Sequence, residues 1–202
     1  MRHLSNIIDR HYGQPFLVCG TGPSIEQYSR EWYINWPGVI IGVNDIVDLF
    51  TPDYLVNVHE LQNVMLCNIE GHREEIAYSF YNPSTQVSPE KNGQMTIIGT
   101  ICTAAMTAAY HLGAKEIFLI GVDLKTKEGQ THFSGCSSGY GANHFIEQAD
   151  ELRATRRGFQ RIYNFCAKKN VPVYNLSKDS LLPESNLNAP LTEVPDETAI
   201  YS

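Results

Sequence analysis

Two short apolar runs in this chain each end at a glycine, and a polar residue lies within two positions after it. The first run, FLVC at residues 16–19, ends in GTGPS at residues 20–24. The second, IFLIG at residues 117–121, leads into Val122 and Asp123. A short continuous apolar run bounded by turn residues predicts a strand buried on both faces of a parallel sheet. Because parallel strands end at one edge of a sheet, the residues after these runs are expected to meet at a ligand-binding edge.

Strands and helices alternate along the rest of the chain. Strands are expected at Phe16–Cys19, Gly38–Asn44, Tyr54–Val58, Ala77–Tyr81, Met95–Gly99, Ile117–Gly121 and Val171–Ser177. Helices are expected at 24–30, in the alanine-rich segment 100–112 that Gly113 ends, and from Phe145 to Cys166. This alternation predicts a single α/β domain with a mainly parallel sheet flanked by helices. We expect the domain at residues 15–182, after an N-terminal extension (1–14) and before an extended or disordered tail (183–202).

Composition and charge argue against several classes of protein. The formal charge of −7 and the pI near 5.4 argue against a protein that grips a phosphate backbone, so no nucleic-acid groove is expected. No apolar run approaches the roughly 20 residues that span a bilayer. The N-terminus lacks the apolar segment of a signal peptide, so we expect a cytoplasmic protein. The cysteines form no C-x-x-C pair, and Cys19, Cys102 and Cys166 lie in apolar patterns that predict buried thiols.

The glycine turn at residues 20–24 is a candidate phosphate-binding site. Gly20 and Gly22 allow the backbone to approach a ligand closely, and free N–H groups at the start of a following helix attract anions. Thr21 and Ser24 add hydroxyl groups. The turn matches neither G-x-G-x-x-G nor the G-K-[ST] of a Walker loop. A tight strand-to-helix turn that Ser24 caps explains the same residues.

Other polar residues follow predicted strands or begin the alanine-rich helix. At those positions they can reach a ribose, a base edge, a phosphate group or a metal ion. Each can instead cap a helix, form a turn or lie on the surface. These residues are Asn44, Asp45, His59, Glu60, Thr100 and Asp123.

The segment 125–143 is a long loop for a compact domain, and it carries His132 and Tyr140, with His144 just beyond it. Its glycines are typical of a lid that closes over a substrate, although a surface excursion explains the length as well. The arginines at 153, 156, 157 and 161 share much of one side of the predicted long helix. They are expected to form a solvated face or to contact phosphates or an acidic partner.

Four segments, in this order, resemble a known superfamily: VCGTGPSIEQ, IIGVNDI, PDYLVNVHE and AAYHLGAKEIFLIGVDL. It contains the bacterial lipooligosaccharide sialyltransferases and the motility accessory factor and 6-hydroxymethylpterin pyrophosphokinase-like family. The segment FQRIYNFCAKKNVPVYNLSKDSLL also resembles the helix–strand–NSLL ending of the sialyltransferases. The resemblance covers residues 15–182. It implies a Rossmann-like fold whose first glycine loop holds the phosphates of a donor nucleotide.

The resemblance also implies roles for single residues. The sialyltransferases use a histidine in the loop after the G-x-D strand as general base, and tyrosines there ease departure of the phosphate. This implies His144 as the base, with His132 as the second choice, and Tyr140 beside them. The expected donor-binding residues are Gly20, Thr21, Gly22, Ser24, Asn44, Thr100 and Asp123.

We therefore expect a metal-independent glycosyltransferase that uses a nucleotide-sugar donor resembling CMP-sialic acid and a hydroxyl-bearing acceptor such as a glycan. No metal is required, because no D-x-D pair follows a strand, and no further cofactor is expected. One alternative is a Mg²⁺-dependent pyrophosphokinase acting on a pterin-like alcohol, with Asp45, Glu60 and Asp123 as metal ligands. The other is a non-catalytic nucleotide-binding module. Association into a homo-oligomer stays open.

Overall fold

The computed structural model describes residues 2–3, 7–58, 64–70, 73–78, 80–82, 94–96, 100–125, 132–133, 149–177 and 180–182. The strands are β1 Arg2–His3, β2 Pro15–Cys19, β3 Val39–Val43, β4 Tyr54–Val58, β5 Val64–Glu70, β6 Arg73–Tyr78, β7 Phe80–Asn82, β8 Gln94–Thr96, β9 Glu116–Ile120 and β10 Val173–Asn175. The helices are α1 Arg30–Ile34, α2 Ile101–Leu112 and α4 Ala149–Lys168, with 3₁₀ helices η2 Pro23–Gln27 and η3 Asn44–Asp48.

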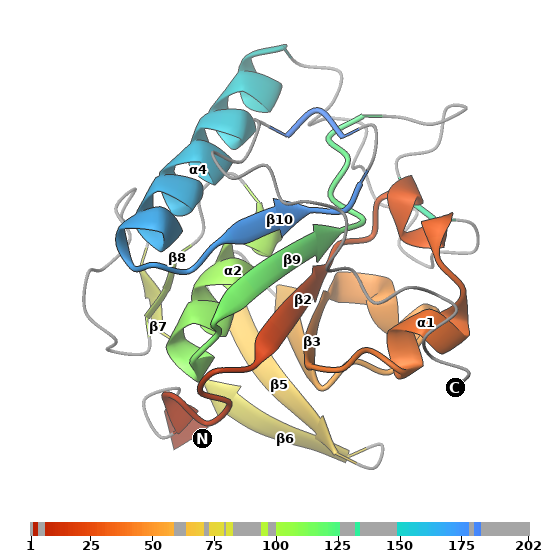
Figure 1. Ribbon diagram of the computed structural model, residues 1–202, viewed down its shortest axis with the longest axis vertical. Helices are drawn as coiled ribbons and strands as arrows, with labels where there is room; N and C mark the ends of the chain where they lie inside the picture. Colours follow the sequence, from red (N-terminus) through yellow and green to blue (C-terminus); the bar gives the residue numbers. More distant parts are fainter. Residues whose placement is uncertain are drawn as a thin grey trace.

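One large sheet with helices on both faces forms the centre of the described part of the chain (Figure 1). Its strand order is β1-β6-β5-β4-β3-β2-β9-β10, and the five neighbours from β4 to β10 all run parallel. The order reverses between β2 and β9, which is the arrangement of a Rossmann-like sheet. The predicted α/β class with a mainly parallel sheet is confirmed.

An antiparallel hairpin extends the sheet beyond β4 and was not expected from the sequence. β5 pairs antiparallel with β4, and β6 pairs antiparallel with β5. The expected single strand at 77–81 is wrong, because β6 ends at Tyr78 and β7 begins at Phe80, where it pairs with β8 in a second sheet. Pairings such as Leu55 with Cys67 join residues of two different strands, so the apolar pattern of one segment does not reveal them.

The α-helix expected at 24–30 is also wrong. The 3₁₀ helix η2 covers Pro23–Gln27, and α1 begins only at Arg30, where the Ser29 hydroxyl accepts a hydrogen bond from the Trp32 amide at 3.3 Å. Pro23, Ser24 and Ile25 are buried one after another. The Ile25 N–H bonds to the Gly22 carbonyl three residues before it, which is the 3₁₀ pattern.

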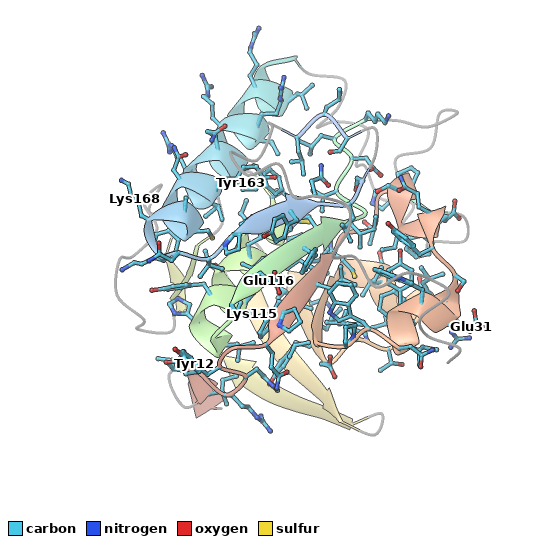
Figure 2. The ribbon with its side chains drawn as sticks, viewed as in Figure 1. Tyr12, Glu31, Lys115, Glu116, Tyr163 and Lys168 are labelled. Carbon is cyan, nitrogen blue, oxygen red and sulfur yellow. The ribbon has the colours of Figure 1, made fainter. Side chains whose placement is uncertain are left out.

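The core has two layers, one on each face of the sheet. From β2, Phe16 and Val18 pack toward α2 and α4, whereas Leu17 and Cys19 pack toward η2, α1 and η3. Figure 2 shows Tyr163 on the side of α4 that faces the sheet, while Lys168 points away from it. The predicted buried cysteines are confirmed, as are the small core residues of α2. They are Cys19, Cys102, Cys166, Ala104, Ala105 and Ala108.

The direction of α2 determines which edge its N-terminus faces. The helix ends at Gly113, whose φ of 100° is left-handed as predicted, and β9 starts three residues later. The backbone N–H groups of His11 and Gly13 bond to the last carbonyls of this helix region, at Leu112 and Gly113. The N-terminus of α2 therefore lies toward the carboxyl ends of the strands it covers. No helix in the described residues is long and apolar enough to cross a membrane.

Candidate functional site

The carboxyl ends of β2 and β9 meet at the point where the strand order reverses. Gly20 follows β2 and Gly121 follows β9, and the Gly22 N–H donates a 2.7 Å hydrogen bond to the Gly121 carbonyl. A Cβ atom at Gly20 would overlap that same carbonyl oxygen. A Cβ atom at Gly22 would lie 2.5 Å from Oδ2 of Asp123. The glycines of the turn are therefore required by the contact between the two loops, whether or not a ligand approaches them.

Ser24 joins the ends of three strands through its backbone and its hydroxyl. Its N–H donates to Oδ2 of Asp123 at 2.8 Å, and its Oγ accepts from the Gly121 N–H at 3.0 Å. The same Oγ lies 2.7 Å from Oγ of Ser177, which follows β10. Because these groups are buried, each hydrogen bond satisfies a polar atom that would otherwise be costly. We call this group the switch-point cluster: Gly20, Gly22, Ser24, Gly121, Asp123 and Ser177.

The segment after β10 lies against the same loop. Ser180 donates its hydroxyl to the Val122 carbonyl at 2.7 Å, and the Leu181 N–H donates to the Asp123 carbonyl at 2.8 Å. Sequence reasoning singled out Ser24 and Asp123 but not Ser177 or Ser180. The available signal was their place directly after the last predicted strand, at the edge where the other strands end.

A second group lies toward β3, beside the switch-point cluster. β2 and β3 pair with Cys19 opposite Gly42, so Thr21 and Asn44 follow neighbouring strands at the same level. Asn44 has a left-handed φ of 48° and begins η3, which also contains Asp45. The Phe133 N–H donates to the Thr21 carbonyl at 2.9 Å, which brings His132 to the same edge. We call Thr21, Asn44, Asp45 and His132 the β3-side group.

All four members of the β3-side group are half-buried. Burial lowers the pKa of His132 below its ordinary value of 6.5, and the nearby Asp45 carboxylate opposes that shift. The imidazole is therefore mostly neutral at pH 7 and can accept a proton. Phe133, next along the chain, packs in the core layer that contains Ile25 and Ile46, so it anchors the backbone that carries the histidine. Phe133 was not singled out from the sequence.

Thr100 caps α2 at the same edge of the sheet. Its Oγ1 accepts a hydrogen bond from the Cys102 N–H at 3.4 Å, and its carbonyl accepts one from the Thr103 hydroxyl at 2.6 Å. The cap explanation for this residue thus has direct support. The positive end of the α2 dipole lies at its N-terminus, where it favours an anion.

Several predicted site residues lie outside the described part of the chain. They are His59, Glu60, Tyr140 and His144. Across the described residues, no three His, Cys, Asp or Glu side chains are grouped closely enough to hold a metal ion. Asp45 and Asp123 belong to different groups, the first acting on His132 and the second bonded to the Ser24 amide.

No protein-family model, no curated protein and no solved structure matches this chain. The functional proposal therefore rests on the geometry of the two groups.

Proposed function

We propose that the protein is a glycosyltransferase that binds a nucleotide-sugar donor at the carboxyl ends of β2 and β3 and uses His132 as general base. The supporting observation is the position of His132, which the Phe133–Thr21 hydrogen bond holds beside the glycine turn with a lowered pKa. A neutral histidine at the ligand-binding edge of a Rossmann-like sheet is suited to proton transfer.

In the proposed reaction, an acceptor hydroxyl attacks the anomeric carbon of the donor sugar. A ring nitrogen of His132 takes the hydroxyl proton as the new C–O bond forms, and the bond between the sugar and the nucleotide phosphate breaks. The negative charge of Asp45 stabilises the imidazolium that results. The leaving phosphate stays near Thr21 and the N-terminal end of α2, where the helix dipole favours negative charge.

The donor contacts expected of the two groups differ. The Ser24 hydroxyl accepts a hydrogen bond from the Gly121 N–H and forms another with the Ser177 hydroxyl. The proposal therefore does not require Ser24 to bind the donor. The half-buried side chains of Thr21 and Asn44 are the proposed contacts to the phosphate and to the ribose or base. The roles of Ser24 and Asp123 as direct donor ligands stay predictions.

A substrate panel tests the proposal. Purified protein is incubated with CMP-, UDP- and GDP-linked sugars, including CMP-sialic acid, with and without glycan acceptors, and release of the nucleotide is measured. We expect turnover without added metal, and a loss of about 10²- to 10⁴-fold in His132→Gln. His11→Gln is the matched control, because His11 is also half-buried with a lowered pKa but lies at the other end of the strands, against Tyr54.

Three results would contradict the proposal. One is nucleotide binding with no release from any donor, which would support the non-catalytic module. The second is Mg²⁺-dependent release of AMP from ATP with a pterin-like alcohol, which would support the pyrophosphokinase. The third is a His132→Gln protein as active as the wild type, which would leave the base to another residue such as His144.

A further inference from the structure

From residue 152 onward, α4 and the turn after it carry charges of one sign, whereas the first turn of the helix contains Asp150 and Glu151. Between residues 152 and 170 the chain has six of its 15 lysines and arginines, and it has no aspartate or glutamate there. All six cations are exposed. They are Arg153, Arg156, Arg157, Arg161, Lys168 and Lys169. Because the whole chain has a formal charge of −7, this surface is a positive region on an acidic molecule.

Five of the cations form a strip along the outward side of α4, and Lys169 lies directly after the helix. Phe159, Ile162 and Tyr163 bury the other side of α4 against the sheet, and Figure 2 shows Lys168 directed away from it. Arg153, Arg157 and Arg161 follow one another at intervals of four residues, which places them on one side of the helix. From Arg153 to Lys168 the strip extends roughly 22 Å along the helix axis, at about 1.5 Å per residue.

This pattern differs from an ordinary solvated helix face. Opposite charges four residues apart stabilise a helix, whereas like charges at that spacing destabilise it. Arg157 has an arginine four residues before it and another four residues after it. The exposed residues between the cations are small or polar, Ala154, Asn164 and Ala167 among them. The face therefore lacks the apolar side chains that would form the centre of a protein–protein interface.

We propose that the basic face of α4 docks flat against an anionic phospholipid bilayer, at the level of the headgroups. A planar anionic surface meets all the cations of the strip together, and each of them adds to the affinity. The exposed side chains between the cations are small or polar, so none of them inserts into the bilayer core and the contact is electrostatic. The rest of the chain has a formal charge of −13, which is −7 less the six positive charges, and salt screens its repulsion beyond about 10 Å.

A membrane fits this face better than a nucleic acid does. Single strands bind where bases stack on exposed aromatic rings, and the aromatic residues of α4, such as Phe159 and Tyr163, lie toward the core.

Vesicle sedimentation tests the proposal on the full chain and needs no catalytic activity. The vesicles contain phosphatidylcholine alone, or phosphatidylcholine with roughly one-third phosphatidylglycerol. We expect binding only to the anionic vesicles, and weaker binding as salt shortens the Debye length from about 10 Å toward 3 Å. The triple variant Arg156→Gln, Arg157→Gln, Lys168→Gln should bind them on the order of a hundredfold more weakly.

The control variant removes the same charge elsewhere. Arg10→Gln, Arg30→Gln, Lys115→Gln replaces three exposed cations outside α4 and should keep its affinity within roughly threefold of the wild type. Far-ultraviolet circular dichroism should show an intact α4 in the first variant, because it loses like-charge repulsion. Equal binding to both kinds of vesicle, or equal weakening in both triple variants, would overturn the proposal. So would α4-dependent binding to a short DNA duplex that exceeds the binding to anionic vesicles.

Discussion

Two neighbouring groups at one edge of the sheet differ in what their polar atoms contact. In the switch-point cluster the side chains are buried, and the Ser24 amide and hydroxyl are bonded to Asp123, Gly121 and Ser177. In the β3-side group each member is half-buried, and the group includes a histidine with a lowered pKa. Both groups contain residues that were predicted from the sequence to bind a ligand, such as Ser24 and Asn44.

The difference in burial distinguishes polar residues that bond to one another from polar residues that a ligand can reach. Where the strand order reverses, the loops after β2 and β9 contact each other directly, so their polar groups satisfy one another. One strand away, toward β3, the side chains that follow the strands are only half-buried. If the comparison is correct, changes in the switch-point cluster should lower stability more than changes in the β3-side group do, and changes in the β3-side group should lower activity.

The largest effect on stability is expected from Gly20→Ala. The new methyl group would overlap the Gly121 carbonyl oxygen, so the ends of β2 and β9 must separate. We expect the free energy of unfolding to fall by about 3 kcal/mol, the upper part of the range for overpacking. Urea denaturation measures it. Thr21→Ala, one residue along, should change it by less than about 0.5 kcal/mol, and an equally large loss there would remove the distinction between the two groups.

A smaller loss is expected from Ser24→Ala. The change leaves the buried Gly121 N–H without its acceptor and breaks the contact with the Ser177 hydroxyl, at a cost of about 2 kcal/mol. Ser177→Ala should cost about 1 kcal/mol, and the double variant should cost less than the sum, with a coupling of about 1 kcal/mol. Denaturation of all four proteins in one double-mutant cycle measures this coupling. Additive losses would mean that the two hydroxyls act independently.

The fold was predictable where a short segment reports its own environment. FLVC, VIIGV and EIFLI became β2, β3 and β9, and the alanines and final glycine of α2 took their expected places. The antiparallel β5 and β6 were missed, since their pairing depends on contacts with β4 rather than on their own apolar pattern. η2 was mistaken for an α-helix because a serine at this position is typical of a helix cap. The bonds of Ser24 to Asp123 and Ser177 join residues 99 and 153 positions apart, so no local pattern indicates them.

The candidate site was predictable as an edge of the sheet but not as two groups. Gly20, Thr21, Ser24, Asn44 and Asp123 were all placed at that edge from the ends of predicted strands. Which of them bond to one another depends on the strand order, since β9 lies beside β2 although a hundred residues separate them in sequence. His132 is likewise near Asp45 because residues 132 and 133 lie beside the glycine turn, and no local pattern encodes that contact.

Asp45→Asn tests whether the β3-side group acts as a unit. The Asp45 carboxylate raises the pKa of His132 against the effect of burial, so its removal should lower that pKa further. The shift should be small, because both side chains are half-exposed and solvent screens them. Titration of the His132 ring protons by NMR measures it, and the acidic limb of the activity profile should move to lower pH by the same amount. Asp48→Asn, in the same 3₁₀ helix, is the control, and an equal shift in both variants would assign the effect to net charge.

The smallest expected effect is a pH dependence of stability that His132 and His11 share from opposite ends of the strands. Burial lowers the pKa of each below 6.5 in the folded protein, so the unfolded chain binds protons first as the pH falls. The free energy of unfolding should therefore be greatest above the unfolded value of 6.5 and should decrease as the pH drops from there toward the folded pKa. Since both rings are half-exposed, each contributes less than about 1 kcal/mol. Denaturation between about pH 5.5 and 7.5 should show a shallower slope in His132→Gln and in His11→Gln, and the second should also lose absolute stability because the bond to Tyr54 is lost. An unchanged slope in His132→Gln would mean that burial does not lower the pKa of this histidine. That result would contradict a neutral base in the β3-side group.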